Sequence, residues 1–183
     1  VAYNSDGSRI ISGSWDRTVK LWNATSGEEV RTLKGHQGWV TSVAFSPDGK
    51  RLASSLKTYG RSGRGDVRLW DSETGQELLT IKVGNREGIS SLAFSPDGKF
   101  LYVNESNQRN VWSFTIQSDG SLAHKTLIRQ FPDFGFDGMR CDVDGNLYIT
   151  RHGKGTVIKM TPQGKPFSGL HSSVSIKRLG ASL

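Results

Sequence analysis

The chain has little of what several classes of protein require. Its 183 residues include one cysteine, Cys141, which excludes an internal disulfide and a cysteine-rich zinc site. No apolar run approaches the roughly 18 residues of a transmembrane helix. No basic segment followed by an apolar segment marks a signal peptide. We therefore expect no membrane partner, and the sequence leaves the cellular location unknown.

Helical periodicity is also missing, since no segment keeps a helical spacing of apolar residues over roughly 11 positions. Proline is scarce, with 5 residues, whereas glycine reaches 22. Hydrophobic residues make up 34% of the chain. With the glycines, that fraction is ordinary for a globular protein, so the chain can bury a core and wholesale disorder is excluded.

Acidic residues are absent from Arg151 to the end of the chain, and the formal net charge is +7. Basic residues also gather in one loop, where Lys57, Arg61 and Arg64 form a candidate basic patch. Such patches can bind phosphate backbones or anionic surfaces. No aromatic interleaving or groove-reading helix accompanies this charge. Nucleic acid is therefore not the expected partner, and a basic-patch binder stays a third hypothesis.

Internal repeats decide the fold class. An apolar segment ending in Asp-Gly occurs at Val1–Gly7, Val43–Gly49 and Leu92–Gly98, with a weaker copy at Cys141–Gly145. A second landmark follows each copy, and it ends at Trp22, Trp70, Trp112 and Met160 in turn.

Each repeat contains four short apolar segments separated by turn residues, which predicts four antiparallel strands. Such a sheet cannot bury both faces alone, and radial stacking of the copies solves that problem. We predict an all-β, propeller-type array of about four four-stranded antiparallel blades. Because Val1 falls inside a repeat, we expect a truncated N-terminus and an incomplete array, whose open edges favour self-association.

Residues 1–84 contain Gly35-His36, Trp70-Asp71 and the segment Ser14–Trp22. On these motifs, this part of the chain resembles WD-repeat proteins. The resemblance implies a binding platform for protein partners.

The WD-repeat resemblance also implies a buried hydrogen-bonded tetrad of His, Ser or Thr, Asp and Trp. His36 and Trp70 match two of these positions in the second repeat, and Ser54 or Ser55 supplies the third. In the first repeat, Asp16 matches the turn Asp and Trp22 matches the Trp. The turn position of the second repeat falls near Arg64, so that tetrad lacks its Asp. We interpret these residues as structural.

The second half carries different motifs: Leu101–Phe114, Phe131–Arg140 and Asp142–Val157. These blocks resemble the gluconolactonase / senescence-marker-protein family of six-bladed propellers. The resemblance implies hydrolysis of sugar lactones with a divalent metal, often calcium. We place this half at residues 85–166, followed by an irregular or frayed tail at 167–183.

The gluconolactonase resemblance implies three oxygen ligands for the metal: a Glu of the first blade, an Asn and an Asp. The Asp matches Asp137, while Ser90 stands at the Asn position and the Glu has no counterpart. Asp137 is either a metal ligand or an Asp-Gly turn residue. One carboxylate rarely holds a divalent cation, so no cofactor is certain.

Other polar residues give weaker signals. His124 and His152 have no carboxylate or cysteine at motif spacing, so we expect both on surface loops. Glu105 and Asp133 are candidates for an acid/base pair. Cys141 is expected to be a buried apolar residue rather than a nucleophile.

The leading hypothesis is a WD-repeat interaction scaffold joined to a gluconolactonase-like segment and non-catalytic as it stands. The alternative is a metal-dependent sugar-lactone hydrolase that is active only in a more complete chain or assembly.

Overall fold

The computed structural model describes residues 1–58, 65–83 and 88–167. All secondary-structure elements in these ranges are β-strands, and the strands form four separate sheets. The first sheet contains β1 (Ala2–Tyr3), β2 (Arg9–Gly13), β3 (Val19–Asn23) and β4 (Glu29–Leu33). The second contains β5 (Trp39–Phe45), β6 (Arg51–Lys57), β7 (Gly65–Asp71) and β8 (Glu77–Val83).

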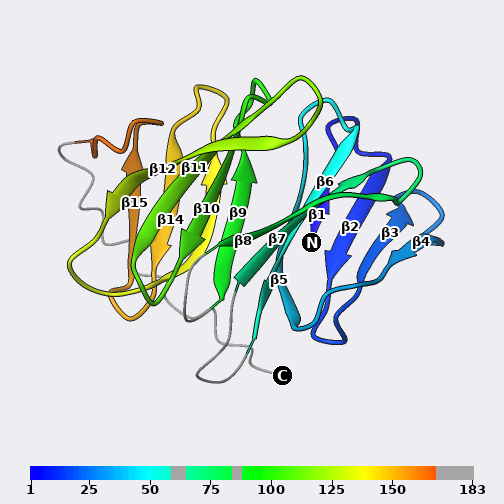
Figure 1. Cartoon of the computed structure of the whole chain (residues 1–183), viewed down its shortest axis with the longest axis horizontal. Helices are drawn as coiled ribbons and strands as arrows, with labels where there is room; N and C mark the ends of the chain where they lie inside the picture. The colour runs from blue at the N-terminus through cyan, green and yellow to red at the C-terminus, as the bar shows by residue number, and fades with distance from the viewer. Residues whose placement is uncertain (59–64, 84–87, 168–183) are drawn as a thin grey trace, which may run out of the picture.

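The third sheet contains β9 (Ile89–Phe94), β10 (Phe100–Glu105), β11 (Asn110–Ile116) and β12 (Leu122–Gln130). The fourth contains β13 (Phe136–Cys141), β14 (Leu147–Arg151) and β15 (Thr156–Met160). Each sheet is antiparallel with its strands in chain order, and the sheets follow one another across the molecule (Figure 1). This arrangement confirms the all-β propeller-type array and is consistent with an incomplete β-propeller.

The Ser-Pro-Asp-Gly segments form the hairpin turns that join the first two strands of the second and third sheets. In the second sheet, Gly49 adopts a φ of 70°, which favours glycine, and its N–H donates to the Ser46 carbonyl. The Asp48 carboxylate accepts hydrogen bonds from the Ser46 hydroxyl and the Lys50 N–H. The turn is thus closed by its own side chains, as Asp-Gly pairs predict.

Strand register places one column of residues in equivalent positions through all four sheets. Tyr3, Ile10 and Trp22 lie opposite one another across β1, β2 and β3. The same column contains Phe45, Leu52 and Trp70 in the second sheet, Phe94, Leu101 and Phe114 in the third, and Cys141, Leu147 and Met160 in the fourth.

This register corrects one repeat landmark. Phe114, not Trp112, is the equivalent of Trp70, because Phe114 pairs with Leu101 whereas Trp112 pairs with Val103. Trp112 lies two residues earlier in its strand. The sequence spacing was misleading because the third repeat carries its tryptophan at a different position of the same strand.

The core lies between consecutive sheets rather than in one central cluster. In β10, Leu101 and Val103 pack against residues of the second sheet, and Tyr102 packs against residues of the fourth. This alternation follows from the two-residue period of a strand, and it buries both faces of the second and third sheets.

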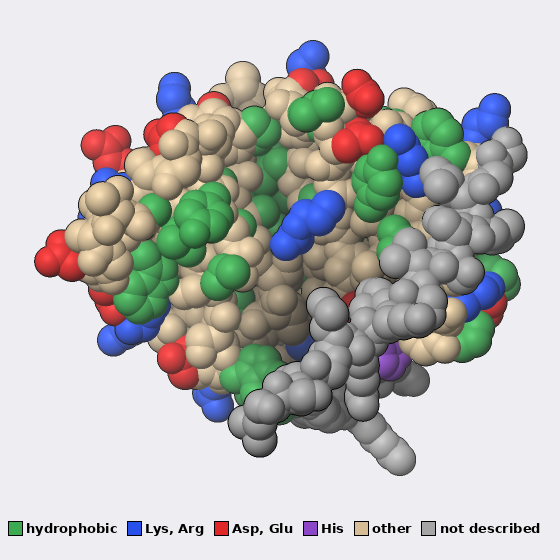
Figure 2. All heavy atoms as spheres, turned by 180° about the vertical axis from the view of Figure 1, so that it is seen from behind, with side chains coloured by type: hydrophobic (Ala, Val, Ile, Leu, Met, Phe, Trp, Pro, Cys, Tyr) green, Lys and Arg blue, Asp and Glu red, His purple; other side chains and the backbone are tan. Residues whose placement is uncertain are grey.

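The surface mixes hydrophobic and charged side chains, as Figure 2 shows for one face. Among the described residues, no helix has the length and apolar character needed to cross a membrane.

Candidate functional site

We call the first strand of each sheet its inner strand. A pocket of about 550 Å³ lies at the N-terminal ends of the inner strands β5, β9 and β13. Its polar lining comes from both halves of the chain and includes Thr41, Lys57, Ser90, Asn107, Asp137 and His152. The structure therefore brings together Ser90 and Asp137, the two positions that sequence reasoning assigned to a metal site. We call this space the axial pocket.

A β-bulge at the same place in each inner strand creates this polar lining. Thr41 is the extra residue between Val40 and Ser42 of β5, and Ser90 is the extra residue of β9. Asp137 lies in the corresponding bulge of β13. Bulges redirect side chains that a regular strand would place elsewhere. Thr41, Ser90 and Asp137 are thus equivalent residues of consecutive blades, and all three line the axial pocket.

Asp137 contacts a histidine that sequence spacing had left without a carboxylate. The Asp137 Oδ1 atom lies 3.2 Å from His152 Nδ1, and both side chains are largely exposed, at 67% and 72%. His152 immediately follows β14, whose last residue, Arg151, pairs with Phe136. Sequence spacing offered His152 no carboxylate partner, and the hairpin supplies one because it brings positions 137 and 152 together.

Ser90 is engaged within its own sheet. Its hydroxyl donates to the Oδ1 atom of Asn104 at 2.8 Å. Asn104 is fully buried, and its Nδ2 has no hydrogen-bond partner among the described residues. Ser90 therefore forms a hydrogen bond within the third sheet and also lines the pocket.

The residues of the axial pocket do not fit the metal that the family resemblance implies. Among the described residues that line the pocket, Asp137 is the one carboxylate, and it faces His152. Nowhere in the described ranges do three or more His, Cys, Asp or Glu residues form a metal-binding group. Calcium takes six to eight oxygen ligands, and this set of donors falls far short.

The second sheet brings His36, Ser54 and Trp70 together. The Trp70 indole N–H donates to Ser54 Oγ at 2.8 Å, and Ser54 Oγ lies 2.7 Å from His36 Nε2. The direction of the bond between Ser54 Oγ and His36 Nε2 depends on the histidine tautomer. Ser54 rather than Ser55 is the shared residue, because Ser55 instead lies 3.1 Å from Thr41 Oγ1.

The electrostatics of this triad keep the histidine neutral. Burial lowers the pKa of His36 from 6.5 to about 4, and the nearby Arg68 charge acts in the same direction. His36 Nδ1 has no partner among the described residues. In a complete tetrad the turn Asp would be the partner of that atom. The lowered pKa leaves the His36 ring neutral at neutral pH.

The first sheet repeats half of this arrangement. The Trp22 indole N–H donates to Ser12 Oγ at 2.8 Å. Asp16 is exposed and accepts hydrogen bonds from the Thr18 N–H and hydroxyl, which closes the turn before β3. In the third and fourth sheets, the positions of Ser54 and Trp70 are taken by the apolar pairs Val103–Phe114 and Ile149–Met160.

Sequence reasoning missed an aromatic pair beside the axial pocket. Trp15 is 70% exposed and lines the pocket. Its ring stacks on Trp39 with centroids 4.7 Å apart and an interplanar angle of 12°. Trp15 had been noticed only as part of a repeat motif, and its sequence neighbours give no sign of this exposure.

The other candidate residues lie in separate networks. Glu105 is buried and accepts hydrogen bonds from the Trp112 and Asn110 side chains. Asp133 pairs with Arg151 and Lys154, which hold its pKa below the usual range through hydrogen bonds and charge. Of the candidate basic patch, Lys57 lines the axial pocket, whereas Arg61 and Arg64 lie outside the described residues.

Four sheets around a shared polar pocket define a repeat protein of the β-propeller class. Residues 41–174 match the family model described as "SMP-30/Gluconolactonase/LRE-like region". This chain belongs to that family. Residues 1–23 also match the model "WD domain, G-beta repeat".

Curated relatives are WD-repeat proteins or carry the names of large assemblies. The chain is 44% identical over 75 residues to "Small ribosomal subunit protein RACK1y" of Oryza sativa subsp. japonica, covering 41% of this chain and 20% of that protein. It is 50% identical over 54 residues to "Dynein assembly factor with WD repeat domains 1" of Danio rerio, covering 29% and 13%. The chain therefore spans a fifth or less of these two relatives.

A solved structure titled "Structure of U3-55K" matches with a TM-score of 0.73 at 24% identity. The match covers 91% of this chain and 49% of that one. At this identity, the likeness supports the fold alone.

Proposed function

We propose that this chain is a WD-repeat-type interaction scaffold whose gluconolactonase-like half has no catalytic activity as it stands. One observation supports the proposal: among the described residues that line the axial pocket, Asp137 is the one carboxylate, and its Oδ1 atom lies 3.2 Å from His152 Nδ1. The position that the family resemblance assigns to an Asn ligand is Ser90, whose hydroxyl is bonded to Asn104. We infer that the boundary between the two halves lies near residues 85–100. This segment follows the last hydrogen bond between a tryptophan and a serine of the tetrad type, which joins Trp70 to Ser54.

The exposed Trp15 supports a binding role. A rigid, stacked tryptophan beside a polar pocket resembles the aromatic anchors that dominate protein interfaces. The relatives named for a ribosomal subunit and for dynein assembly are WD-repeat or assembly proteins. These likenesses support a protein partner for this chain without identifying it.

The decisive experiment is a lactone hydrolysis assay with the purified chain and an excess of calcium, combined with calcium titration calorimetry. We expect no hydrolysis above background and no calcium binding below millimolar concentration. Hydrolysis proportional to protein concentration and abolished in Asp137→Asn would overturn the proposal.

The runner-up function, a metal-dependent sugar-lactone hydrolase, is favoured by the convergence of Ser90 and Asp137 on one pocket. It predicts that Ser90→Asn raises calcium affinity by restoring an oxygen ligand beside Asp137. Thr41→Asn is the matched control, because Thr41 occupies the equivalent bulge one blade earlier. A gain in Ser90→Asn alone would support a remnant metal site, and no gain in either variant would count against it.

A further inference from the structure

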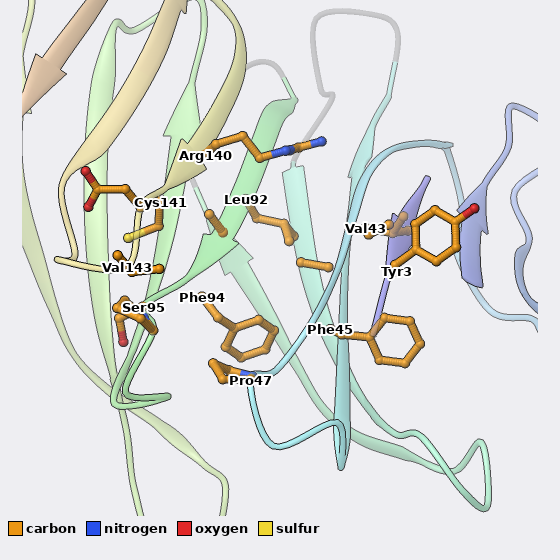
Figure 3. A pocket seen from close by; sticks show the side chains of 15 residues that line it. Tyr3, Val43, Phe45, Pro47, Leu92, Phe94, Ser95, Arg140, Cys141 and Val143 are labelled. Carbon is orange, nitrogen blue, oxygen red and sulfur yellow. The ribbon is translucent and has the colours of Figure 1, made fainter. Parts of the chain in front are cut away.

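A second pocket lies at the opposite ends of the inner strands, where they lead into the hairpin turns. It has a volume of about 260 Å³ and is lined by residues of β1, β5, β9 and β13 (Figure 3). Neither the tetrad-like residues nor the residues of the axial pocket contribute to it. We call this space the turn-side pocket.

The repeat itself makes most of this pocket apolar. Tyr3, Phe45 and Phe94 are equivalent residues of the first three sheets, and all three line it. Pro47 and Pro96, from equivalent turns, extend the apolar lining. The first three blades thus each contribute an aromatic ring, which suits an apolar ligand body.

The fourth sheet breaks the repeat with a charge. Where the first three inner strands carry Ala2, Ala44 and Ala93, β13 carries Arg140. Figure 3 shows the Arg140 side chain extending from β13 across the pocket above Leu92.

The Arg140 guanidinium keeps most of its hydrogen-bonding capacity. It donates from Nη1 to the Met139 carbonyl at 3.0 Å, which uses one of its five N–H groups. In the part of the chain that the structure describes, no carboxylate lies within ion-pair distance of Arg140. The Asp142 carboxylate also lines the pocket, and it is bonded to Asn146, Tyr148 and Lys159.

We propose that the turn-side pocket binds a small amphiphilic carboxylate, with its apolar body on the aromatic and proline lining and its carboxylate on Arg140. A guanidinium binds a planar carboxylate through two parallel hydrogen bonds. The volume accommodates a body about the size of one ring with a short chain. The overall charge of +7 favours an anion over a cation. The binding is independent of the scaffold function and of lactone hydrolysis.

Titration calorimetry with 4-phenylbutyrate tests the proposal on the whole chain. The neutral analogue 4-phenylbutanol has the same apolar body and should bind at least about tenfold more weakly. Arg140→Gln should weaken 4-phenylbutyrate binding by about tenfold or more. Lys82→Gln is the matched control, because it removes one exposed positive charge from the outer strand β8 and should change the affinity less than about twofold.

A second variant probes the same pocket without touching the core. Val143 lines the pocket and is 88% exposed, so Val143→Glu should fold normally and repel the carboxylate. Circular dichroism melting confirms that each variant is folded. Equal affinity of Arg140→Gln and the parent chain, or no binding of 4-phenylbutyrate to the folded parent chain at millimolar concentration, would overturn the proposal.

Discussion

The Oγ atom of Ser91 lies 3.1 Å from the backbone nitrogen of Met139 and accepts its hydrogen bond. This contact joins β9 of the third sheet to β13 of the fourth. The equivalent serine of the second sheet, Ser42, accepts the N–H of Leu92 at 3.2 Å. One serine in each of these inner strands thus satisfies a backbone donor of the next blade, and the blades are linked by hydrogen bonds as well as by apolar packing.

Removal of this link should destabilise the array. Ser91 is buried, with 3% of its surface exposed, so Ser91→Ala leaves the Met139 N–H without an acceptor at a cost of about 1–3 kcal/mol. Urea unfolding monitored by circular dichroism measures the loss. Ser5→Ala, at an exposed turn residue, is the control and should change the free energy of unfolding by less than about 0.5 kcal/mol. Equal stability of the two variants would refute the role of Ser91.

The Ser54 hydroxyl of the second sheet should contribute more to the free energy of unfolding than the Ser12 hydroxyl of the first sheet. Ser54→Ala orphans both the Trp70 N–H and His36 Nε2, two buried groups that each cost about 1–3 kcal/mol when unsatisfied. Ser12→Ala removes only the acceptor of the half-buried Trp22. We therefore expect Ser54→Ala to lower the free energy of unfolding about twice as much as Ser12→Ala. Chemical denaturation of both variants compares them, and a larger effect at Ser12 would contradict this interpretation.

His36 should make the fold sensitive to acid. Its pKa is about 4 in the folded chain and 6.5 ordinarily, so between these pH values the unfolded chain binds a proton that the native chain does not. Stability is therefore fully present above pH 6.5 and falls as the pH decreases toward 4. The loss attributable to His36 is about 3 kcal/mol.

The control for this effect is His36→Gln, which removes the titrating group. The pH dependence of unfolding between 6.5 and 4 should be shallower in the variant than in the parent chain. An NMR titration of the His36 imidazole gives an independent measure, and an ordinary value near 6.5 would show that the ring is not buried as described.

The fold was predictable from the sequence because each sequence repeat corresponds to one blade. Each Asp-Gly turn marks a hairpin, and the turn spacing predicts the sheets without knowledge of any distant contact. The register inside a blade was harder to predict. Trp112 was taken as the equivalent of Trp70 from spacing alone, whereas strand pairing assigns that position to Phe114.

The axial pocket was only partly predictable. The family resemblance singled out Ser90 and Asp137, but not the bulges that place both beside Thr41. The contact of Asp137 with His152 was missed because the partners are 15 positions apart and meet through the pairing of β13 with β14. Bulges and hairpin contacts of this kind depend on tertiary packing, which single-sequence patterns do not report.

Cys141 should be an unreactive thiol despite lining the turn-side pocket. Burial raises its pKa from the usual 9 to about 11, and the Asp142 and Asp97 charges act in the same direction. The thiolate is the reactive form, so a pKa two units higher lowers its population about 100-fold near pH 8. Alkylation by iodoacetamide, followed by mass spectrometry, should be slower in the folded chain by roughly that factor than in urea. Because Cys141 is the chain's one cysteine, the rate reports on this site alone. Equal rates in the folded and unfolded chains would place the thiol in free solvent and contradict its position in the pocket wall.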